Sequence, residues 1–345
     1  MKKKKYNVAI VGATGVVGSQ MLETLAKRNF PVNKIRLLAS ERSVGKKISF
    51  KGKKVKVELL ADDVFSDIDI VLSSAGASLS KRFLPAAVKA GAVCIDNTSA
   101  YRMNDKVPLV VPEVNPKDIF KHNGIIANPN CSTIQMVVAL KPLHDYAKIK
   151  RIVVSTYQAV SGAGNPALSQ LEKETVLIGP KRSGRLPGKY KPSKFPYQIA
   201  YNLIPHIDVF LGNGYTKEEM KMVNETRKIF HDKSIGITAT CVRVPVFVSH
   251  SEAVNIETKK PLTPVKARQI LKKSPGVKVV DNLEKLQYPM PVDATGSYDT
   301  YVGRIRKDES IKNGLNLWIV SDNLLKGAAL NAVQIAELLI KDMNE

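Results

Sequence analysis

The stretch YNVAIVGATGVVG, residues 6–18, places a glycine-rich loop directly after a short apolar segment near the start of the chain. Residues 6–11 have the composition of a buried strand, and an amphipathic helix is predicted after the loop, through Leu25. A glycine loop between a strand and a helix lets the backbone approach a pyrophosphate at the helix N-terminus. The spacing is G-x-x-G-x-x-G rather than the familiar G-x-G-x-x-G, yet its position predicts nucleotide binding. The loop residues expected to meet the nucleotide are Gly12, Ala13, Thr14, Gly15 and Val16.

The remaining sequence predicts the fold class. Up to residue 145, short apolar strands alternate with helical segments, which is typical of βαβ units and a parallel sheet. From residue 151, long β-rich runs are separated by helices, a pattern that favours a mixed or antiparallel sheet. We therefore predict an α/β protein with an N-terminal Rossmann-like dinucleotide-binding domain and a mixed α+β substrate and dimerisation domain. The expected bounds are residues 1–130, completed by a C-terminal helix at 324–345, and residues 131–323, with an irregular basic loop at 179–193.

Length and composition narrow the class of protein. The chain has 345 residues, enough for two domains, and its 44% hydrophobic and 24% charged residues are typical of a globular protein. No apolar run approaches the roughly 20 residues that span a bilayer, and no signal peptide is recognised, so we expect a cytoplasmic protein without a membrane partner. The three cysteines are widely spread, which argues against a disulfide framework and against a zinc site; no metal is expected.

The net charge of +22 raises the question of a nucleic-acid partner. The lysines are distributed over the whole chain, and no single basic patch is interleaved with aromatic residues. This distribution favours a solvated lysine-rich surface, so no nucleic-acid partner is expected. The same positive field would attract anionic substrates and cofactors.

The second predicted strand, residues 34–39, leads into the segment Ser40-Glu41-Arg42-Ser43. An acidic residue at this position favours a free ribose hydroxyl, whereas a nearby arginine accommodates a 2′-phosphate. Ser40 and Arg42 therefore favour NADP over NAD as the cofactor, while Glu41 alone would favour NAD.

A cysteine lies at the predicted start of a helix in the segment NPNCSTIQ, residues 128–135. Pro129 disfavours helix before it, Asn130 is a good N-cap, and apolar residues recur with helical spacing afterwards. The positive end of the helix dipole favours thiolate over thiol at Cys131. An isolated cysteine is more often a small buried residue, so the nucleophile hypothesis depends on partners elsewhere in the chain.

Two further segments supply such partners. In QAVSGAG, residues 158–164, Gln158 ends a predicted strand and is followed by a glycine-rich turn with several backbone N–H groups. In SHSEAV, residues 249–254, His250 lies in an otherwise apolar strand with a carboxylate two residues later. Paired with an activated cysteine, this histidine is a candidate acid/base.

Together, GATGVVG, ASERS, NPNCST, QAVSGAG and SHSEAV, in this order, resemble the aspartate-β-semialdehyde dehydrogenases of the bacterial type. The similarity extends from Tyr6 through the C-terminal helix. The resemblance implies NADPH-dependent reduction of 4-aspartyl phosphate to L-aspartate 4-semialdehyde, in the biosynthesis of lysine, diaminopimelate, methionine and threonine, by a homodimeric enzyme.

The resemblance also implies roles for particular residues. Cys131 matches the nucleophile, His250 the acid/base and Gln158 the glutamine beside the cysteine. Arg243 resembles the arginine that holds the substrate carboxylate, and Arg102 the one that holds phosphate. Glu218 and Lys221, three positions apart on a predicted helix, resemble the pair near the substrate amine and phosphate. Besides the glycine loop, the implied NADP residues are Ser40, Arg42, Ser161, Gly162 and Asn323.

The chemistry is consistent with these residue types. Reduction of an acyl phosphate to an aldehyde requires a nucleophile that displaces phosphate and leaves a thioester able to accept hydride. The oxyanions need N–H donors, and planar arginines suit carboxylate and phosphate.

Three alternatives remain open at this point. An N-acetyl-γ-glutamyl-phosphate reductase uses a cysteine, a histidine and the cofactor in the same way, but its substrate carries an acylated amine. A Cys-His hydrolase would not need the glycine loop, and a nucleic-acid-binding protein on an inactive dehydrogenase fold would not need Cys131, Gln158 and His250.

Overall fold

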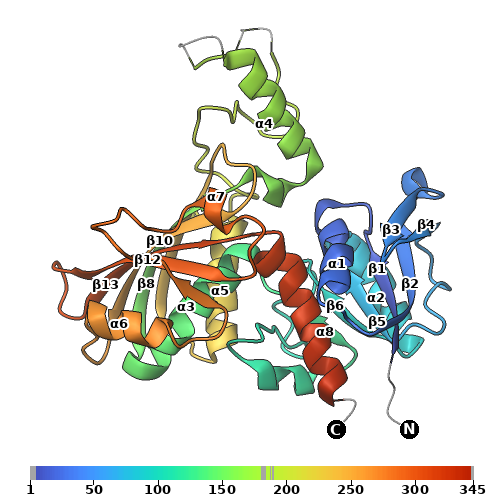
Figure 1. Ribbon diagram of the computed structural model, residues 1–345, viewed down its shortest axis with the longest axis horizontal. Coiled ribbons are helices and arrows are strands. Elements are labelled where there is room, and N and C mark those ends of the chain that lie inside the picture. Colours follow the sequence, from blue (N-terminus) through green and yellow to red (C-terminus); the bar gives the residue numbers. More distant parts are fainter. Residues whose placement is uncertain (1–4, 180–183, 187, 189, 343–345) are drawn as a thin grey trace. The chain divides into compact units, whose positions relative to one another are not determined.

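The computed structural model describes residues 5–179, 184–186, 188 and 190–342. The chain divides into two compact units, Met1–Asn130 with Gly327–Glu345, and Cys131–Lys326. Each unit is built around its own sheet (Figure 1). Within the described residues, no helix is both long and apolar enough to cross a membrane.

The first unit contains a seven-stranded sheet in the order β3-β4-β2-β1-β5-β6-β7. All neighbouring strands are parallel except β3 and β4. The strand order reverses between β1 and β5, which lie side by side, and such a switch point is where open α/β sheets bind ligands. The elements are β1 (Tyr6–Val11), α1 (Val16–Lys27), β2 (Val32–Ala39), β3 (Lys47–Phe50), β4 (Lys53–Leu59), β5 (Ile70–Ser73), α2 (Ala77–Lys89), β6 (Val93–Asp96), β7 (Ile125–Ala127) and α8 (Leu330–Asp342).

Both faces of this sheet are covered, as expected for parallel strands. On one face, Val8 and Ile10 of β1 pack in a core with residues of α1 and α8. On the other face, Ala9 and Val11 pack in a second core with residues of α2. This two-sided burial explains why the strands are nearly continuous apolar runs in the sequence.

The β3–β4 hairpin was not predicted from the sequence. Its strands are rich in lysine, and they are joined by Lys51 and Gly52, which both have positive φ (46° and 80°). Such a pair matches a tight two-residue hairpin turn, which favours glycine. The exposed lysines obscured the apolar alternation on which the prediction relied.

The second unit contains a six-stranded mixed sheet in the order β11-β12-β13-β10-β8-β9. Buried residues alternate along β8, at Ile152, Val154, Thr156 and Gln158, and helices α3, α5 and α6 pack against the sheet. The elements are α3 (Cys131–Ala147), β8 (Ile149–Gln158), α4 (Asn165–Ile178), α5 (Lys217–Phe230), β9 (Gly236–Arg243), β10 (His250–Thr258), α6 (Pro264–Leu271), β11 (Val277–Val279), α7 (Pro291–Ala294), β12 (Thr300–Asp308) and β13 (Gly314–Ser321).

The predicted fold class, a Rossmann-like domain followed by a mixed α+β domain, is confirmed. One predicted element differs: the final helical segment is not a single α-helix, because Leu325–Ala329 forms a π-helical turn before α8 begins. Within the predicted basic loop at 179–193, residues 180–183, 187 and 189 lie outside the described residues.

Candidate active site

Cys131 is the first residue of α3, as the sequence predicted, and its side chain is partly exposed. The other two cysteines, Cys94 and Cys241, are buried. The residue after Cys131, Ser132, accepts a hydrogen bond from the side-chain amide of Gln158. The start of α3 is thereby joined to the end of β8.

Strand pairing brings three predicted residues into one row, called here the first row: His250, Gln158 and Arg243. Gln158 at the end of β8 pairs with Arg243 at the end of β9. His250 begins β10, and because the next residue, Ser251, pairs with Tyr157, His250 lies opposite Gln158. All three side chains are at least 94% buried, since none exceeds 6% relative exposure. The sequence could not show this row, because the register between strands is a tertiary property.

The ring of His250 is oriented by the backbone. The N–H of Ala159 donates to Nδ1 at 3.0 Å, so a neutral ring carries its proton on Nε2. Burial, helped by the nearby Arg243 cation, lowers the pKa of His250 to about 3, while Glu218 opposes this. A β-carbon added at Gly162 would lie only 3.4 Å from Nε2, so glycine leaves this side of the ring open.

Arg243 is fixed by its surroundings. Its Nη1 donates to the carbonyl of Ala159 at 2.7 Å, and its guanidinium carbon lies 5.7 Å from the centre of the Phe195 ring. Burial lowers the pKa of Arg243, and electrostatic interactions with Glu218 and Cys131 are among the influences that oppose this. Its Nε has no hydrogen-bond partner among the described residues. Burying an unpaired donor of a cation is energetically unfavourable unless a ligand accepts its hydrogen bond.

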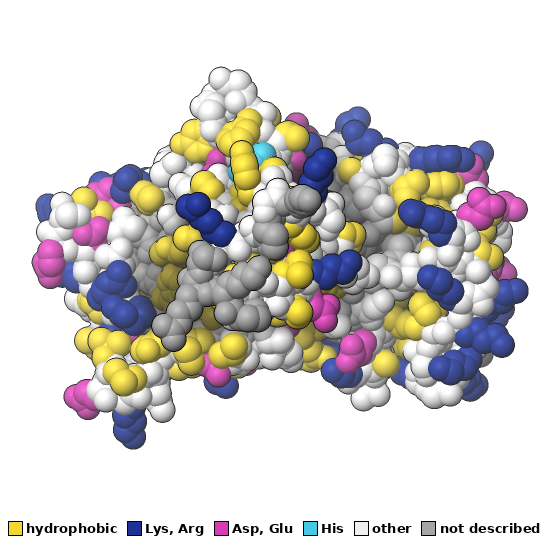
Figure 2. All heavy atoms as spheres, turned by 90° about the horizontal axis from the view of Figure 1, so that it is seen from above, with side chains coloured by type: hydrophobic (Ala, Val, Ile, Leu, Met, Phe, Trp, Pro, Cys, Tyr) yellow, Lys and Arg dark blue, Asp and Glu magenta, His cyan; other side chains and the backbone are white. Residues whose placement is uncertain are grey.

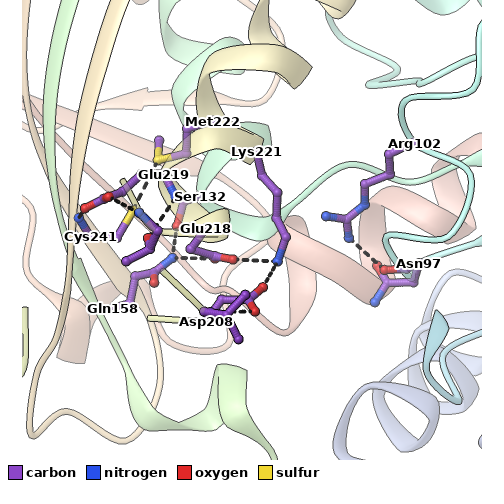
Figure 3. A network of polar contacts seen from close by, with 12 residues as sticks. Asn97, Arg102, Ser132, Gln158, Asp208, Glu218, Glu219, Lys221, Met222 and Cys241 are labelled. Atoms are coloured by element: carbon purple, nitrogen blue, oxygen red, sulfur yellow. Dashed lines mark hydrogen bonds and ion pairs between the residues drawn. The ribbon is translucent and has the colours of Figure 1, made fainter. Parts of the chain in front are cut away.

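Glu218 and Lys221 form an ion pair on α5, with 2.9 Å between Nζ and Oε2, and Lys221 also donates to Asp208 at 2.8 Å (Figure 3). Burial alone would lower the pKa of Lys221, but these two carboxylates raise it above its usual value. The other oxygen of Glu218 accepts from Gln158 at 3.2 Å. The pair is therefore connected to the first row.

Glu219, the neighbour of Glu218, has a structural task. It completes a capping box with Thr216 at the start of α5, and its Oε1 accepts from the backbone N–H of Cys241 at 3.0 Å. Both carboxylate oxygens of Glu219 are used in these contacts, whereas Glu218 contacts Gln158 and Lys221. The two adjacent glutamates therefore differ in their contacts.

Arg102 lies in the first unit. Its Nε donates to the carbonyl of Asn128 at 2.9 Å, and its Nη2 donates to the carbonyl of Asn97 at 2.8 Å. The amide of Asn128 also donates to the side chain of Asn97 at 2.6 Å. Arg102 therefore links the segment after β6 to the segment that precedes Cys131 in sequence.

The glycine loop has the geometry of a phosphate-binding turn. Gly12 follows β1 with φ of +86°, and a β-carbon there would lie 3.0 Å from the backbone of Ala75. A β-carbon at Gly18 would lie 2.2 Å from the carbonyl oxygen of Gly12, so glycine permits the close approach of α1. Gly15 is the N-cap of α1 without a side-chain cap, and the first turn has no acidic residue. The start of α1 therefore favours an anion.

The predicted ribose segment lies beside this loop. The hydroxyls of Thr14 and Ser43 are 3.2 Å apart, which joins the loop to the segment after β2. Ser40 and Arg42 in that segment are exposed.

In the second unit, Ser161 and Asn323 contact one another, with 2.9 Å between Asn323 Nδ2 and Ser161 Oγ. Asn323 Oδ1 also accepts from the N–H of Ser249, the residue before His250. The predicted cofactor residues of this unit, Ser161, Gly162 and Asn323, thus lie around the histidine.

Asp208 and the capping role of Glu219 were not predicted from the sequence. Asp208 carried no motif, and its contact with Lys221 joins positions 13 residues apart. A Thr-x-x-Glu pattern before the helix at 217–230 was present and would have indicated the capping box.

Comparison with known proteins identifies the class. The family model for the semialdehyde dehydrogenase NAD binding domain matches residues 7–122, and that for the semialdehyde dehydrogenase dimerisation domain matches residues 140–326. The chain belongs to the semialdehyde dehydrogenase family, and the second match agrees with the predicted homodimer.

Within this family, the chain is similar to aspartate-semialdehyde dehydrogenases. It is 57% identical over 342 residues to that of Aquifex aeolicus, covering 98% of each chain, and 53% identical over 339 residues to that of Bacillus subtilis, covering 97% of each. The solved structure of aspartate semialdehyde dehydrogenase II from Vibrio cholerae complexed with ASA has a TM-score of 0.94 and 50% identity, with 99% of each chain covered. The Candida albicans enzyme, solved with NADP, has a TM-score of 0.74 and 25% identity, with 98% of this chain and 99% of that chain covered.

These findings confirm the resemblance and do not favour the alternative reductase or the hydrolase. On the face shown in Figure 2, lysine and arginine side chains are interspersed with acidic, apolar and uncharged ones.

Proposed function

We propose that this chain catalyses the reversible, NADPH-dependent reduction of 4-aspartyl phosphate to L-aspartate 4-semialdehyde and phosphate. The observation that carries the proposal is the first row, His250, Gln158 and Arg243, next to a helix that begins with Cys131. The full-length similarity to aspartate-semialdehyde dehydrogenases supports it. In this proposal the first unit, with α8, is the NADP-binding domain, and the second unit is the catalytic and dimerisation domain.

Cys131 is the proposed nucleophile. Its thiolate attacks the acyl carbon of the aspartyl phosphate; the tetrahedral oxyanion then collapses, the C–O bond to phosphate breaks, and a thioester remains. NADPH, when bound, supplies the hydride that reduces this thioester. The resulting oxyanion expels the thiolate of Cys131 and leaves the aldehyde, while the released phosphate takes up one proton overall.

His250 is the proposed acid/base, and the hydrogen bond at its Nδ1 defines which ring nitrogen carries the proton before the reaction. Because Nδ1 accepts from Ala159, Nε2 is the atom that holds the proton and can donate to an oxyanion. Gly162 leaves space beside Nε2. Gln158, whose Oε1 has no partner in the described part of the chain, is proposed to orient the substrate beside Cys131.

Different charged residues are proposed to bind different groups of the substrate. Arg243, with a buried Nε that needs a partner, is proposed to bind the substrate carboxylate. Glu218 is proposed to bind the free ammonium, which an acetylated substrate lacks. Arg102 and Lys221 are proposed to bind phosphate.

The cofactor is proposed to be NADP. Gly12, Ala13, Thr14, Gly15 and Val16 form the turn for its pyrophosphate, Ser40 and Arg42 would hold the 2′-phosphate, and Ser161, Gly162 and Asn323 would lie near the nicotinamide. The exposed guanidinium of Arg42 beside the loop supports NADP over NAD. Because the mechanism requires reduced Cys131, we place the reaction in the cytoplasm, where thiols are kept reduced.

A spectrophotometric assay in the reverse direction tests the proposal. Purified protein is mixed with L-aspartate semialdehyde, phosphate and NADP, and NADPH formation is followed. We expect a rate that depends on all three compounds. A parallel assay with N-acetyl-glutamate semialdehyde should give little activity. A higher kcat/KM for the acetylated substrate would contradict the proposal.

A further inference from the structure

A second row of buried polar side chains lies directly behind the first. Two residues further along β10, Glu252 pairs with Thr156 of β8, and Thr156 pairs with Cys241 of β9. Alternate residues of a strand point to the same face, so this second row, Glu252, Thr156 and Cys241, shares a face with the first. The proposed reaction gives the second row no chemical step.

Glu252 has no exposed surface, and neither of its carboxyl oxygens has a hydrogen-bond partner among the described residues. The same holds for Oγ1 of Thr156 and for Oε1 of Gln135. Gln135 lies on α3, four residues after Cys131, and its Nε2 donates to the backbone carbonyl of His250 at 3.3 Å. A neutral acid offers Oε1 of Gln135 the donor that it lacks, whereas an ionised carboxylate offers only acceptors.

The electrostatic setting agrees with a neutral acid. Burial raises the pKa of Glu252 well above its usual value, and only the Gln135 side chain opposes this. Among its titratable neighbours, burial also raises the pKa of Cys241 in the same row and lowers that of His250 in the first row. Both of these groups are therefore uncharged near neutral pH, and neither offers Glu252 a counterion.

We propose that Glu252 is a positioning residue that remains protonated throughout turnover, donating its O–H to the amide oxygen of Gln135 and thereby fixing the first turns of α3 to β10. Cys131 begins α3, and His250 begins β10. Glu252 therefore sets the distance between the proposed nucleophile and the proposed acid/base without contacting substrate. The inference rests on the proposed function for the roles of Cys131 and His250.

Two substitutions separate positioning from proton transfer. Glu252→Gln keeps a neutral group with one donor and one acceptor, so we expect a kcat close to that of the wild type. Glu252→Leu removes the proposed hydrogen bond to Gln135, and we expect kcat to fall by about ten- to hundredfold because a misplacement of 1 Å costs that much. The KM for phosphate should remain unchanged in both variants. Equal losses in the two variants would overturn the neutral role, and an unchanged Glu252→Leu variant would overturn the positioning role.

Infrared difference spectroscopy of the wild type against Glu252→Gln tests the protonation state without substrate. We expect the carbonyl stretch of a protonated carboxylic acid in the wild type at neutral pH, absent from the variant. A carboxylate signal instead would overturn the inference even if Glu252→Leu fails to fold. If the acid signal is present but the protein lacks dehydrogenase activity, the proposed function fails and the protonation of Glu252 stands.

Thermal unfolding at several pH values tests how the ionisation of Glu252 changes the stability of the fold. An unfolded glutamate ionises near pH 4.3. Above that pH the folded wild type retains a proton that the unfolded chain has released, so its stability decreases as pH rises toward the folded pKa. Glu252→Gln lacks this dependence. We expect the Tm of the wild type to fall relative to that of Glu252→Gln between pH 5 and 7, and a constant difference would contradict a raised pKa.

Discussion

The glycine loop of the first unit and the first row of the second unit hold their proposed ligands in different ways. The loop relies on backbone N–H groups and on exposed side chains, Ser40 and Arg42, that contact little else. The first row consists of buried side chains, each oriented by another residue: His250 by Ala159, Gln158 by Ser132 and Glu218. Substitutions in the loop should therefore act locally and modestly, whereas those around the first row should be large and coupled.

The largest effect is expected for Cys131→Ser. A serine hydroxyl at the same helix start is not ionised at neutral pH, and its ester is a poorer hydride acceptor than a thioester. We expect kcat to fall by roughly 10⁴-fold or more, as when other covalent enzymes lose their nucleophile. NADPH binding, measured by fluorescence titration, should be nearly unchanged. Activity close to that of the wild type would exclude the covalent mechanism.

The next largest effects separate Arg243 from Arg102. Loss of a buried charge partner costs about 2–5 kcal/mol, or roughly thirtyfold or more. Arg243→Leu should therefore damage the use of semialdehyde most, and Arg102→Leu should chiefly raise the KM for phosphate. Arg243→Lys is the control, because lysine keeps the charge and lacks the planar fork. Equal shifts of both constants in both leucine variants would show that the division of roles is wrong.

The sequence predicted most of the fold because its signals are local. β1 was predicted with the bounds that the structure shows, and α3 begins at Cys131 as expected. The β3–β4 hairpin was missed because its exposed lysines interrupt the apolar pattern.

The site was predicted as a set of residues, not as an arrangement. Glycine loops and a cysteine at a helix start are visible in the sequence because each depends on neighbouring residues. The rows depend on strand register, which brings Gln158 beside Arg243 and Thr156 beside Glu252 over long sequence separations. No local pattern indicated that Asp208 contacts Lys221 or that Glu252 is buried.

A smaller effect is expected in the cofactor loop. Arg42→Ala removes a charge-assisted contact to the 2′-phosphate, worth about 1.5–3 kcal/mol. The preference for NADPH over NADH, as a ratio of kcat/KM values, should fall by about ten- to hundredfold. Lys54→Ala, which removes an exposed cation from the hairpin of the same unit, is the control for net charge and should leave the ratio unchanged. If both variants changed the ratio equally, general electrostatic attraction would explain cofactor choice.

The smallest effect tests whether coupling extends to the helix that carries Glu218 and Lys221. Thr216 caps α5 and Thr263 caps α6, each accepting from a backbone N–H. Alanine at either position should cost about 1 kcal/mol, or a few degrees in Tm for a unit of this size. Thr216→Ala should in addition raise the KM for semialdehyde about two- to fivefold, which corresponds to a few tenths to 1 kcal/mol. The reason is that the loss of the cap also loosens Glu219, which accepts a hydrogen bond from the N–H of Cys241.

Calorimetry and steady-state kinetics of the two variants measure the changes in stability and in KM. An equal loss of stability without any change in KM would mean that α5 tolerates local disorder, and that the coupling around the first row ends at Gln158.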